Sequence, residues 1–226
     1  MLDPRNDYIS VTYNKQTHPY TEYPDLLAKY LVSRYELRSN QRLLEVGCGR
    51  GEFLRGFIRQ GLEGYGTDQS DVARNLCPDA KIKLANLEDR IPFEDNFFDV
   101  IYSKSVIEHF YKPEKLVEEI YRTLKPSGRV ITLTPDWTHV YKSFYEDYTH
   151  RTPFTQASLR DIMLIHSFEE VEVGEFLQLP IVWKFPWMKY LSKIIACVTP
   201  QVTVKKFKFV RFSKEVMLLS SAIKPE

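Results

Sequence analysis

The chain has 226 residues, of which 43% are hydrophobic and 27% are charged, and its formal net charge is +1. This length and composition fit a globular protein that buries a sizeable core. A net charge near zero excludes a whole-protein field that would collect nucleic acid or an anionic membrane, so no nucleic-acid partner is expected.

Hydrophobic periodicity divides the chain into a polar, tyrosine-rich N-terminal helical cap, residues 1–40, and a segment of alternating strands and helices, residues 41–226. Strands are predicted at 43–46, 64–68, 81–85, 98–102, 129–133, 168–173 and 215–223. Helices are predicted at 52–60 and at 113–124. A short helix is predicted after Ser70, which would be its N-cap, and another from its N-cap Thr155 to residue 166. This alternation indicates an α/β fold with a doubly wound, mostly parallel sheet in one domain, with an insertion at about 178–212 before the last strand.

The first strand runs directly into a glycine-rich turn, and residues 43–53 read LLEVGCGRGEF. Glycines at positions 47, 49 and 51 allow positive φ angles and bring bare backbone against a ligand. The alternative is a tight turn that binds nothing. Because sheets of this kind bind ligands at the carboxyl ends of their strands, we predict a ligand site here.

The charges around this turn distinguish between two kinds of ligand. A dinucleotide would place its anionic pyrophosphate at the start of the following helix, where Glu52 replaces the last glycine of the GxGxxG pattern. Glu45 adds a second negative charge. S-adenosylmethionine carries a positive sulfonium, an ammonium and one carboxylate, which suits an acidic turn better. We therefore predict this methyl donor as the cofactor.

Two further residues follow in the order that an adenosine site requires. Asp68 ends the second strand, where a carboxylate can accept hydrogen bonds from both ribose hydroxyls. Asn86 follows the third strand, where its amide can meet the adenine edge. Taken alone, Asp68 could be an acid at a helix start and Asn86 a turn residue.

The stretches LLEVGCGRGEF, GYGTD, ANLEDRIPFEDNFFDVIYSKSVIEHF and KPEKLVEEIYRTLKPSGRVI resemble class I S-adenosylmethionine-dependent methyltransferases, in particular the group that includes the ubiquinone-biosynthesis enzymes. The resemblance implies a Rossmann-like, seven-stranded sheet in which only the last strand is antiparallel. It also implies the cofactor-binding residues, which are Glu45, Gly47, Cys48, Gly49, Asp68, Gln69, Asn86, Leu87 and Ser103. Many relatives have Asp at position 86.

The methyl acceptor is expected to meet residues that follow the fourth and fifth strands. Glu108 and His109 come after the fourth strand, and His109 is the candidate general base for a hydroxyl acceptor. Its alternative role is to pack the loop. The segment FYEDYTHRTPF resembles one found in methyltransferases of sugar and polysaccharide pathways, and there His150 is the third candidate catalytic residue. Tyr145, Asp147 and Tyr148 could line an acceptor pocket. Since no His, Asp or Glu set has metal-ligand spacing, no metal is predicted.

Large apolar residues and lysines alternate across residues 181–209. This pattern is compatible with peripheral membrane contact and a lipid-linked acceptor, or with a helix packed on the core whose lysines reach water. Three isolated cysteines, a polar N-terminus and the absence of ~18 consecutive apolar residues predict a cytoplasmic protein. An oligomer is compatible with the sequence.

The leading hypothesis is an enzyme that transfers a methyl group from S-adenosylmethionine to a small-molecule or glycan hydroxyl, lipid-linked acceptors included. The first alternative is a non-catalytic cofactor-binding or scaffold module with the same fold. The second is a nicotinamide-dependent oxidoreductase, which Glu52 disfavours.

Overall fold

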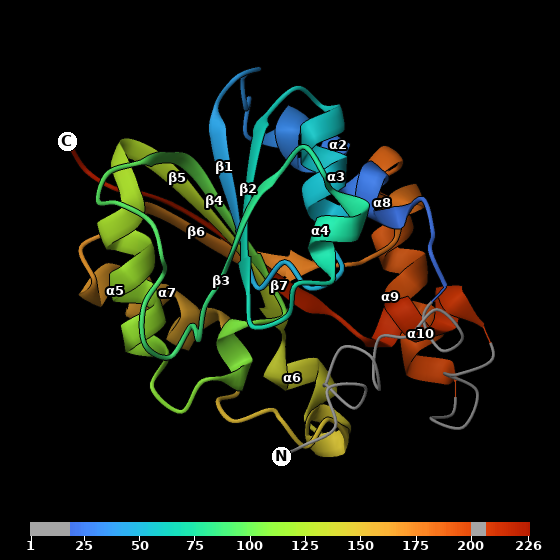
Figure 1. The fold of residues 1–226 in the computed structure, drawn as a ribbon. Coiled ribbons are helices and arrows are strands. Elements are labelled where there is room, and N and C mark those ends of the chain that lie inside the picture. Colours follow the sequence, from blue (N-terminus) through green and yellow to red (C-terminus); the bar gives the residue numbers. More distant parts are fainter. Residues whose placement is uncertain (1–18, 200–206) are drawn as a thin grey trace, which may run out of the picture. The chain divides into compact units, whose positions relative to one another are not determined.

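The computed structural model describes residues 19–199 and 207–226, and the description below refers to them (Figure 1). The strand order is β3-β2-β1-β4-β5-β7-β6. Strand β2 pairs in parallel with β1 and with β3, and β4 pairs in parallel with β5. Strand β7 runs antiparallel to β5 and to β6. The predicted α/β sheet of seven strands with an antiparallel last strand is confirmed. The chain divides into two compact units, Met1–Glu94 and Asp95–Glu226.

The described part of the first unit, from residue 19 on, contains three parallel strands and three helices. The strands are β1 (Arg42–Val46), β2 (Glu63–Asp68) and β3 (Lys81–Leu84), and the helices are α2 (Tyr23–Arg34), α3 (Glu52–Arg59) and α4 (Ala73–Leu76). Helices α2 and α3 lie side by side (Figure 1). Gly56 permits this close packing, because a Cβ there would come within 3.0 Å of the Ala28 Cβ and the Pro24 carbonyl oxygen.

Outside residues 200–206, the second unit contains four strands, with β7 between β5 and β6. The strands are β4 (Phe98–Lys104), β5 (Leu124–Pro135), β6 (Glu169–Phe176) and β7 (Met217–Ile223). The helices are η2 (Ile107–His109), α5 (Pro113–Thr123), α6 (Trp137–Val140), η3 (Phe144–Glu146), α7 (Gln156–Ile165), α8 (Pro180–Lys184), α9 (Met188–Val198) and α10 (Lys208–Lys214). Thr155 caps α7, and its side chain and that of Ser158 form a reciprocal capping box, as the sequence predicts for this cap.

Two local predictions were wrong. Ser70 does not cap α4, because this helix begins at Ala73 after an αR Val72 that gives no side-chain cap. Strand β5 begins at Leu124 instead of residue 129, and α5 correspondingly ends at Thr123. Leu124 is extended, fully buried and paired with Phe98, and the next pair is Val100 with Arg129, so residues 125–128 form a bulge in which Ser127 has a φ angle of 59°.

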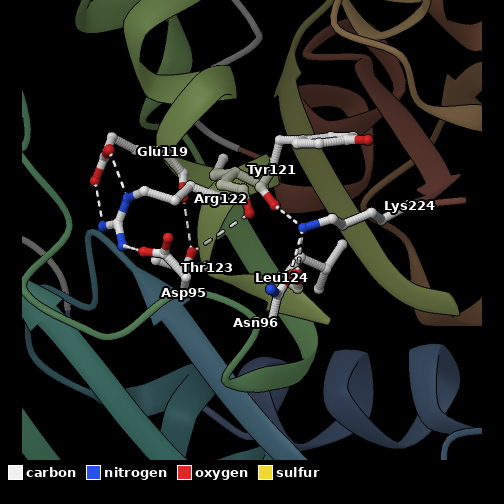
Figure 2. A network of polar contacts seen from close by, with 9 residues as sticks. Asp95, Asn96, Glu119, Tyr121, Arg122, Thr123, Leu124 and Lys224 are labelled. Carbon is white, nitrogen blue, oxygen red and sulfur yellow. Dashed lines mark hydrogen bonds and ion pairs between the residues drawn. The ribbon is translucent and has the colours of Figure 1, made fainter. Parts of the chain in front are cut away.

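A polar network closes the amino end of β4 and β5 in the second unit, as Figure 2 shows. Arg122 forms ion pairs with Glu119 at 2.6 Å and with Asp95 at 2.5 Å. The Lys224 ammonium, which follows β7, donates hydrogen bonds of 2.7–2.9 Å to the Asn96 side chain and to the carbonyls of Tyr121 and Leu124. The polar groups at the amino ends of β4 and β5 are therefore engaged in structural contacts. The candidate site lies at the carboxyl ends of the strands.

Candidate active site

The turn after β1 has the backbone geometry predicted for a ligand cradle. Gly47, Gly49 and Gly51 have φ angles of 68°, 50° and 79°, in the left-handed region that side chains disfavour. A Cβ at Gly49 would meet nothing within 4 Å, so the backbone there faces open space. A Cβ at Gly51 would press on the Cys77 sulfur at 3.1 Å. Gly49 thus leaves room for a ligand, while Gly51 is needed for packing.

The turn is acidic in the structure as well as in the sequence. Glu45 lies on β1 and is only 3% exposed, and Asp68 ends the neighbouring strand β2. Burial, and next the charges of Glu45 and Asp68, raise the pKa of the Cys48 thiol well above its usual range. The two carboxylates would favour a cationic ligand beside the turn.

Asp68 also holds the turn in shape, a role that sequence reasoning missed. One of its carboxylate oxygens accepts a hydrogen bond of 2.8 Å from the Gly49 backbone N–H, and the other accepts one of 2.9 Å from the Ser70 N–H. Each carboxylate oxygen has a second lone pair, so these bonds still allow contact with ribose hydroxyls. Asp68 therefore links the glycine turn to the end of β2.

The residues predicted to meet the adenine lie together at the ends of β2 and β3. The Gln69 side-chain amide donates to the Asn86 side-chain oxygen at 3.4 Å. Asn86 also accepts from the Glu88 N–H and donates to Asp89, so its role as a turn residue is confirmed. Leu87 is buried beside it. An adenine contact by these residues stays a prediction.

The repulsion expected from Glu52 is weaker than the sequence suggests. The Arg50 guanidinium donates to the Glu52 carboxylate through Nε at 2.9 Å, and both side chains are mostly buried. This ion pair neutralises Glu52 locally. The preference for a cation over a pyrophosphate therefore rests on Glu45 and Asp68.

In the second unit, Glu108 occupies a buried position in η2, directly after β4. Its side chain is 0% exposed, and burial raises the pKa of its carboxyl group to about 7. One carboxylate oxygen accepts a hydrogen bond of 3.0 Å from the Thr134 hydroxyl on β5. The other, Oε1, is buried and has no hydrogen-bond partner among the described residues.

His109 is adjacent, and a short hydrogen-bond chain fixes its ring. The Thr149 hydroxyl donates to Asp147 at 2.6 Å and lies 2.9 Å from Nδ1 of His109. Since the hydroxyl has one proton and gives it to Asp147, it accepts from Nδ1–H, which puts the lone pair of the neutral ring on Nε2. Burial, and then the neighbouring His150, lower the pKa of His109, so the neutral form is favoured.

His150 comes to the same place from a loop 41 positions further along the chain. Its ring centroid lies 4.9 Å from that of His109, and its Nδ1 donates to the Phe144 carbonyl at 2.6 Å, so in the neutral ring Nε2 carries the lone pair. The backbone N–H groups of Arg151 and Thr152 both donate to the Glu108 carbonyl. These bonds attach the loop to η2, so the three predicted catalytic residues lie together.

The other predicted residues take different positions. Ser103 lies on β4 with a buried hydroxyl that has no hydrogen-bond partner within the described ranges. Tyr145 and Tyr148 are largely exposed, Tyr148 at 76%. Asp147 contacts Thr149 and thereby supports His109. Sequence reasoning did not identify Thr134 or Thr149, because no local pattern marks a threonine that serves a distant side chain.

Comparison with known proteins gives matches consistent with this geometry. Residues 44–132 match the family model of the methyltransferase domain. The chain is 30% identical over 129 residues to 24-methylenesterol C-methyltransferase 2 of Arabidopsis thaliana, covering 53% of this chain and 35% of that protein. It thus spans about a third of the length of this curated relative.

Two solved structures share the fold at low sequence identity. Phosphoethanolamine N-methyltransferase 2 of Haemonchus contortus, in complex with S-adenosyl-L-methionine, superposes with a TM-score of 0.67 at 20% identity, over 88% of this chain and 52% of that chain. A putative methyltransferase of Haloferax volcanii, solved with its Trm112 activator, gives 0.73 at 19% identity over 100% of both chains.

The fold and the matched residues define the class of protein: the chain carries a class I methyltransferase domain. The solved structures show that the chain has the fold of class I methyltransferases, and one of them was solved in complex with S-adenosyl-L-methionine. The residues present fit this cofactor, because Gly49 leaves open space beside an acidic strand end.

Proposed function

We propose that the protein transfers the methyl group of S-adenosylmethionine to a hydroxyl of a small-molecule or glycan acceptor, lipid-linked acceptors included. The observation that carries this proposal is the turn after β1, where Gly49 faces open space and Glu45 and Asp68 supply negative charge. In this proposal Asp68 binds the ribose, Glu45 and the glycines bind the methionine end, and Gln69, Asn86 and Leu87 bind the adenine. Ser103 would serve the methionine end.

The chemistry at the acceptor follows from the nature of methyl transfer. S-adenosylmethionine supplies a methyl group already activated by its sulfonium, so positioning an acceptor oxygen in line accounts for much of the rate. A hydroxyl must also lose its proton. We assign this task to the cluster of Glu108, His109 and His150, in which both imidazoles are hydrogen-bonded through Nδ1.

The names of the relatives bear on the acceptor class only in general terms. One is a sterol C-methyltransferase and one a phosphoethanolamine N-methyltransferase, so similar domains serve small molecules with different methylated atoms. Oxygen as the methylated atom is supported here by the imidazole-carboxylate cluster, since such a group assists the removal of a hydroxyl proton.

A thermal-shift panel tests the cofactor half of the proposal. S-adenosylmethionine and S-adenosylhomocysteine should each raise the melting temperature, because a ligand at 100 times its Kd adds about 2.7 kcal/mol of stability. NAD and NADP should give no shift, since Glu45 and Asp68 repel pyrophosphate. A shift with NAD alone would favour the oxidoreductase alternative.

The non-catalytic alternative differs from the proposed enzyme in the expected result of a turnover assay. A scaffold module would bind S-adenosylmethionine but release no S-adenosylhomocysteine with any member of a panel of phenols, sterols and sugars. The orienting bonds to His109 and His150 speak against it, because a scaffold has no use for two imidazoles with fixed tautomers.

We also propose that the insertion contacts a membrane surface through one face of α9. Trp187 before the helix and Tyr190, Leu191, Ile194 and Val198 within it recur at helical spacing and are 41–71% exposed. The opposite face is held by a hydrogen bond of 2.7 Å between Ser192 and Ser213 of α10. Exposed Trp and Tyr beside lysines suit the interface of an anionic bilayer. No helix in the described part of the chain is long and apolar enough to span a bilayer.

A vesicle assay tests this surface. Ile194→Glu should weaken binding to vesicles that contain anionic phosphatidylglycerol by about tenfold or more, because it replaces an apolar anchor worth roughly 1.5–3 kcal/mol by a charge. Ile165→Glu, at an exposed apolar position on α7, is the matched control and should bind like the wild type. Equal binding of all three proteins, or self-association that Ile194→Glu abolishes, would contradict a membrane role.

A further inference from the structure

We propose that Glu108, His109 and His150 form a binding site for one divalent transition-metal ion. One ligand atom from each of the three residues lies within 4.8 Å of the others. Two imidazoles and one carboxylate form a donor set that suits Zn²⁺, Fe²⁺ or Mn²⁺, whereas Mg²⁺ and Ca²⁺ prefer oxygen ligands. Sequence spacing alone predicts no metal at these three residues, because His150 lies 41 positions after His109.

The buried carboxylate of Glu108 is a separate indication of a missing ligand. Oε1 has no hydrogen-bond partner among the described residues, although the side chain is fully buried. As a carboxylate oxygen it lacks a donor, and as the protonated oxygen of an acid it would lack an acceptor, so either form leaves a polar atom unsatisfied. A cation beside Oε1 removes this cost, while Thr134 continues to hold Oε2.

The surroundings of both imidazoles are those that orient metal ligands. A ligating histidine commonly donates its other ring N–H to a carbonyl or to a group bonded to a carboxylate, which fixes the ring and raises its basicity. His150 donates Nδ1–H to the Phe144 carbonyl, and His109 donates Nδ1–H to Thr149, which in turn donates to Asp147. Both rings therefore have the tautomer that presents Nε2 as a ligand.

An ion at this cluster would explain how the acceptor hydroxyl loses its proton, and this consequence rests on the proposed function. A hydroxyl that coordinates the ion is more acidic and releases its proton to solvent. Its oxygen then forms a bond to the methyl carbon while the carbon–sulfur bond breaks, and the electron pair of that bond stays on sulfur as S-adenosylhomocysteine. His109 acts in this case as a ligand, and the ion replaces a general base.

Metal binding is tested directly on the full chain, without an acceptor. After treatment with EDTA and desalting, titration with Co²⁺ should give visible d–d bands that saturate at one ion per chain, and Zn²⁺ should displace the Co²⁺. His150→Ala and the isosteric Glu108→Gln should each weaken binding by about 10–100-fold or more, as loss of even an outer partner does. His166→Ala, a histidine outside the cluster, should bind as the wild type does.

Calorimetric titration with S-adenosylmethionine on the same samples separates this inference from the proposed function. All variants should bind the cofactor with unchanged affinity, which also shows that they are folded. A wild-type chain that binds the cofactor but takes up no Co²⁺ or Zn²⁺ at 100 times the protein concentration would overturn the metal site and leave the methyltransferase function intact. Equal metal affinity of wild type, His150→Ala and Glu108→Gln would overturn it too.

Discussion

Asp68→Asn should weaken the binding of S-adenosylmethionine by about 100-fold or more. If Asp68 accepts hydrogen bonds from both ribose hydroxyls, the substitution loses part of two bonds to a charged group, each worth about 1.5–3 kcal/mol. It also removes a negative charge that favours the sulfonium. Asn keeps a side-chain oxygen for the Gly49 N–H, so the turn should retain its shape. Isothermal titration calorimetry measures the change in Kd.

Asp71→Asn is the matched control for this variant. It lies three positions further on, is exposed, and removes the same charge without touching the glycine turn. Its Kd should stay within about twofold of the wild-type value. If Asp68→Asn binds the cofactor as tightly as Asp71→Asn while both remain folded, Asp68 does not contact the ribose and the assignment of the cofactor site to this turn is wrong.

His109→Ala should lower turnover by about 100-fold or more, the usual contribution of a group that assists proton transfer. Its affinity for S-adenosylmethionine should change by less than about twofold, because His109 lies in the second unit, in the cluster that we propose meets the acceptor. The assay follows release of S-adenosylhomocysteine with an acceptor that the wild type methylates, taken from a panel of phenols, sterols and sugars. Wild-type turnover of this variant would remove His109 from the reaction.

Two further measurements distinguish a base from a metal ligand at position 109. If His109 is a ligand, EDTA treatment should reduce wild-type turnover to the level of His109→Ala, and added Zn²⁺ or Mn²⁺ should restore the wild type alone. If His109 is instead a general base, EDTA treatment should leave wild-type turnover unchanged. His166→Gln is the control for a histidine outside the cluster and should keep wild-type turnover in both conditions.

Hydrophobic patterning predicted the fold closely because several of the strands are buried, and burial shows in the sequence. LLEV of β1 and the residues of β4 are almost entirely buried, so their apolar runs mark the strands directly. Prediction failed at α4, where a serine resembles a cap but the backbone has already entered the αR region at Val72. Backbone conformation at a helix start depends on packing that residue type does not determine.

The glycine turn was predicted in full, since glycine spacing reports positive φ angles directly. The electrostatics around it were predicted only in part. Glu52 counted as a repelling charge in the sequence, yet Arg50 pairs with it in the structure. Two charged residues that are two positions apart can point toward or away from each other, and only their surroundings decide which.

The sequence by itself determined the class of fold, the position of the glycine turn and the negative charge around it. These features are local, because a strand, a run of glycines and an acid at a strand end each lie within a few consecutive residues. Only the tertiary structure decided that His150 joins Glu108 and His109. The backbone bonds from Arg151 and Thr152 to the Glu108 carbonyl bring the two segments together. Contacts between distant segments depend on how loops dock, and no short-range pattern encodes that docking.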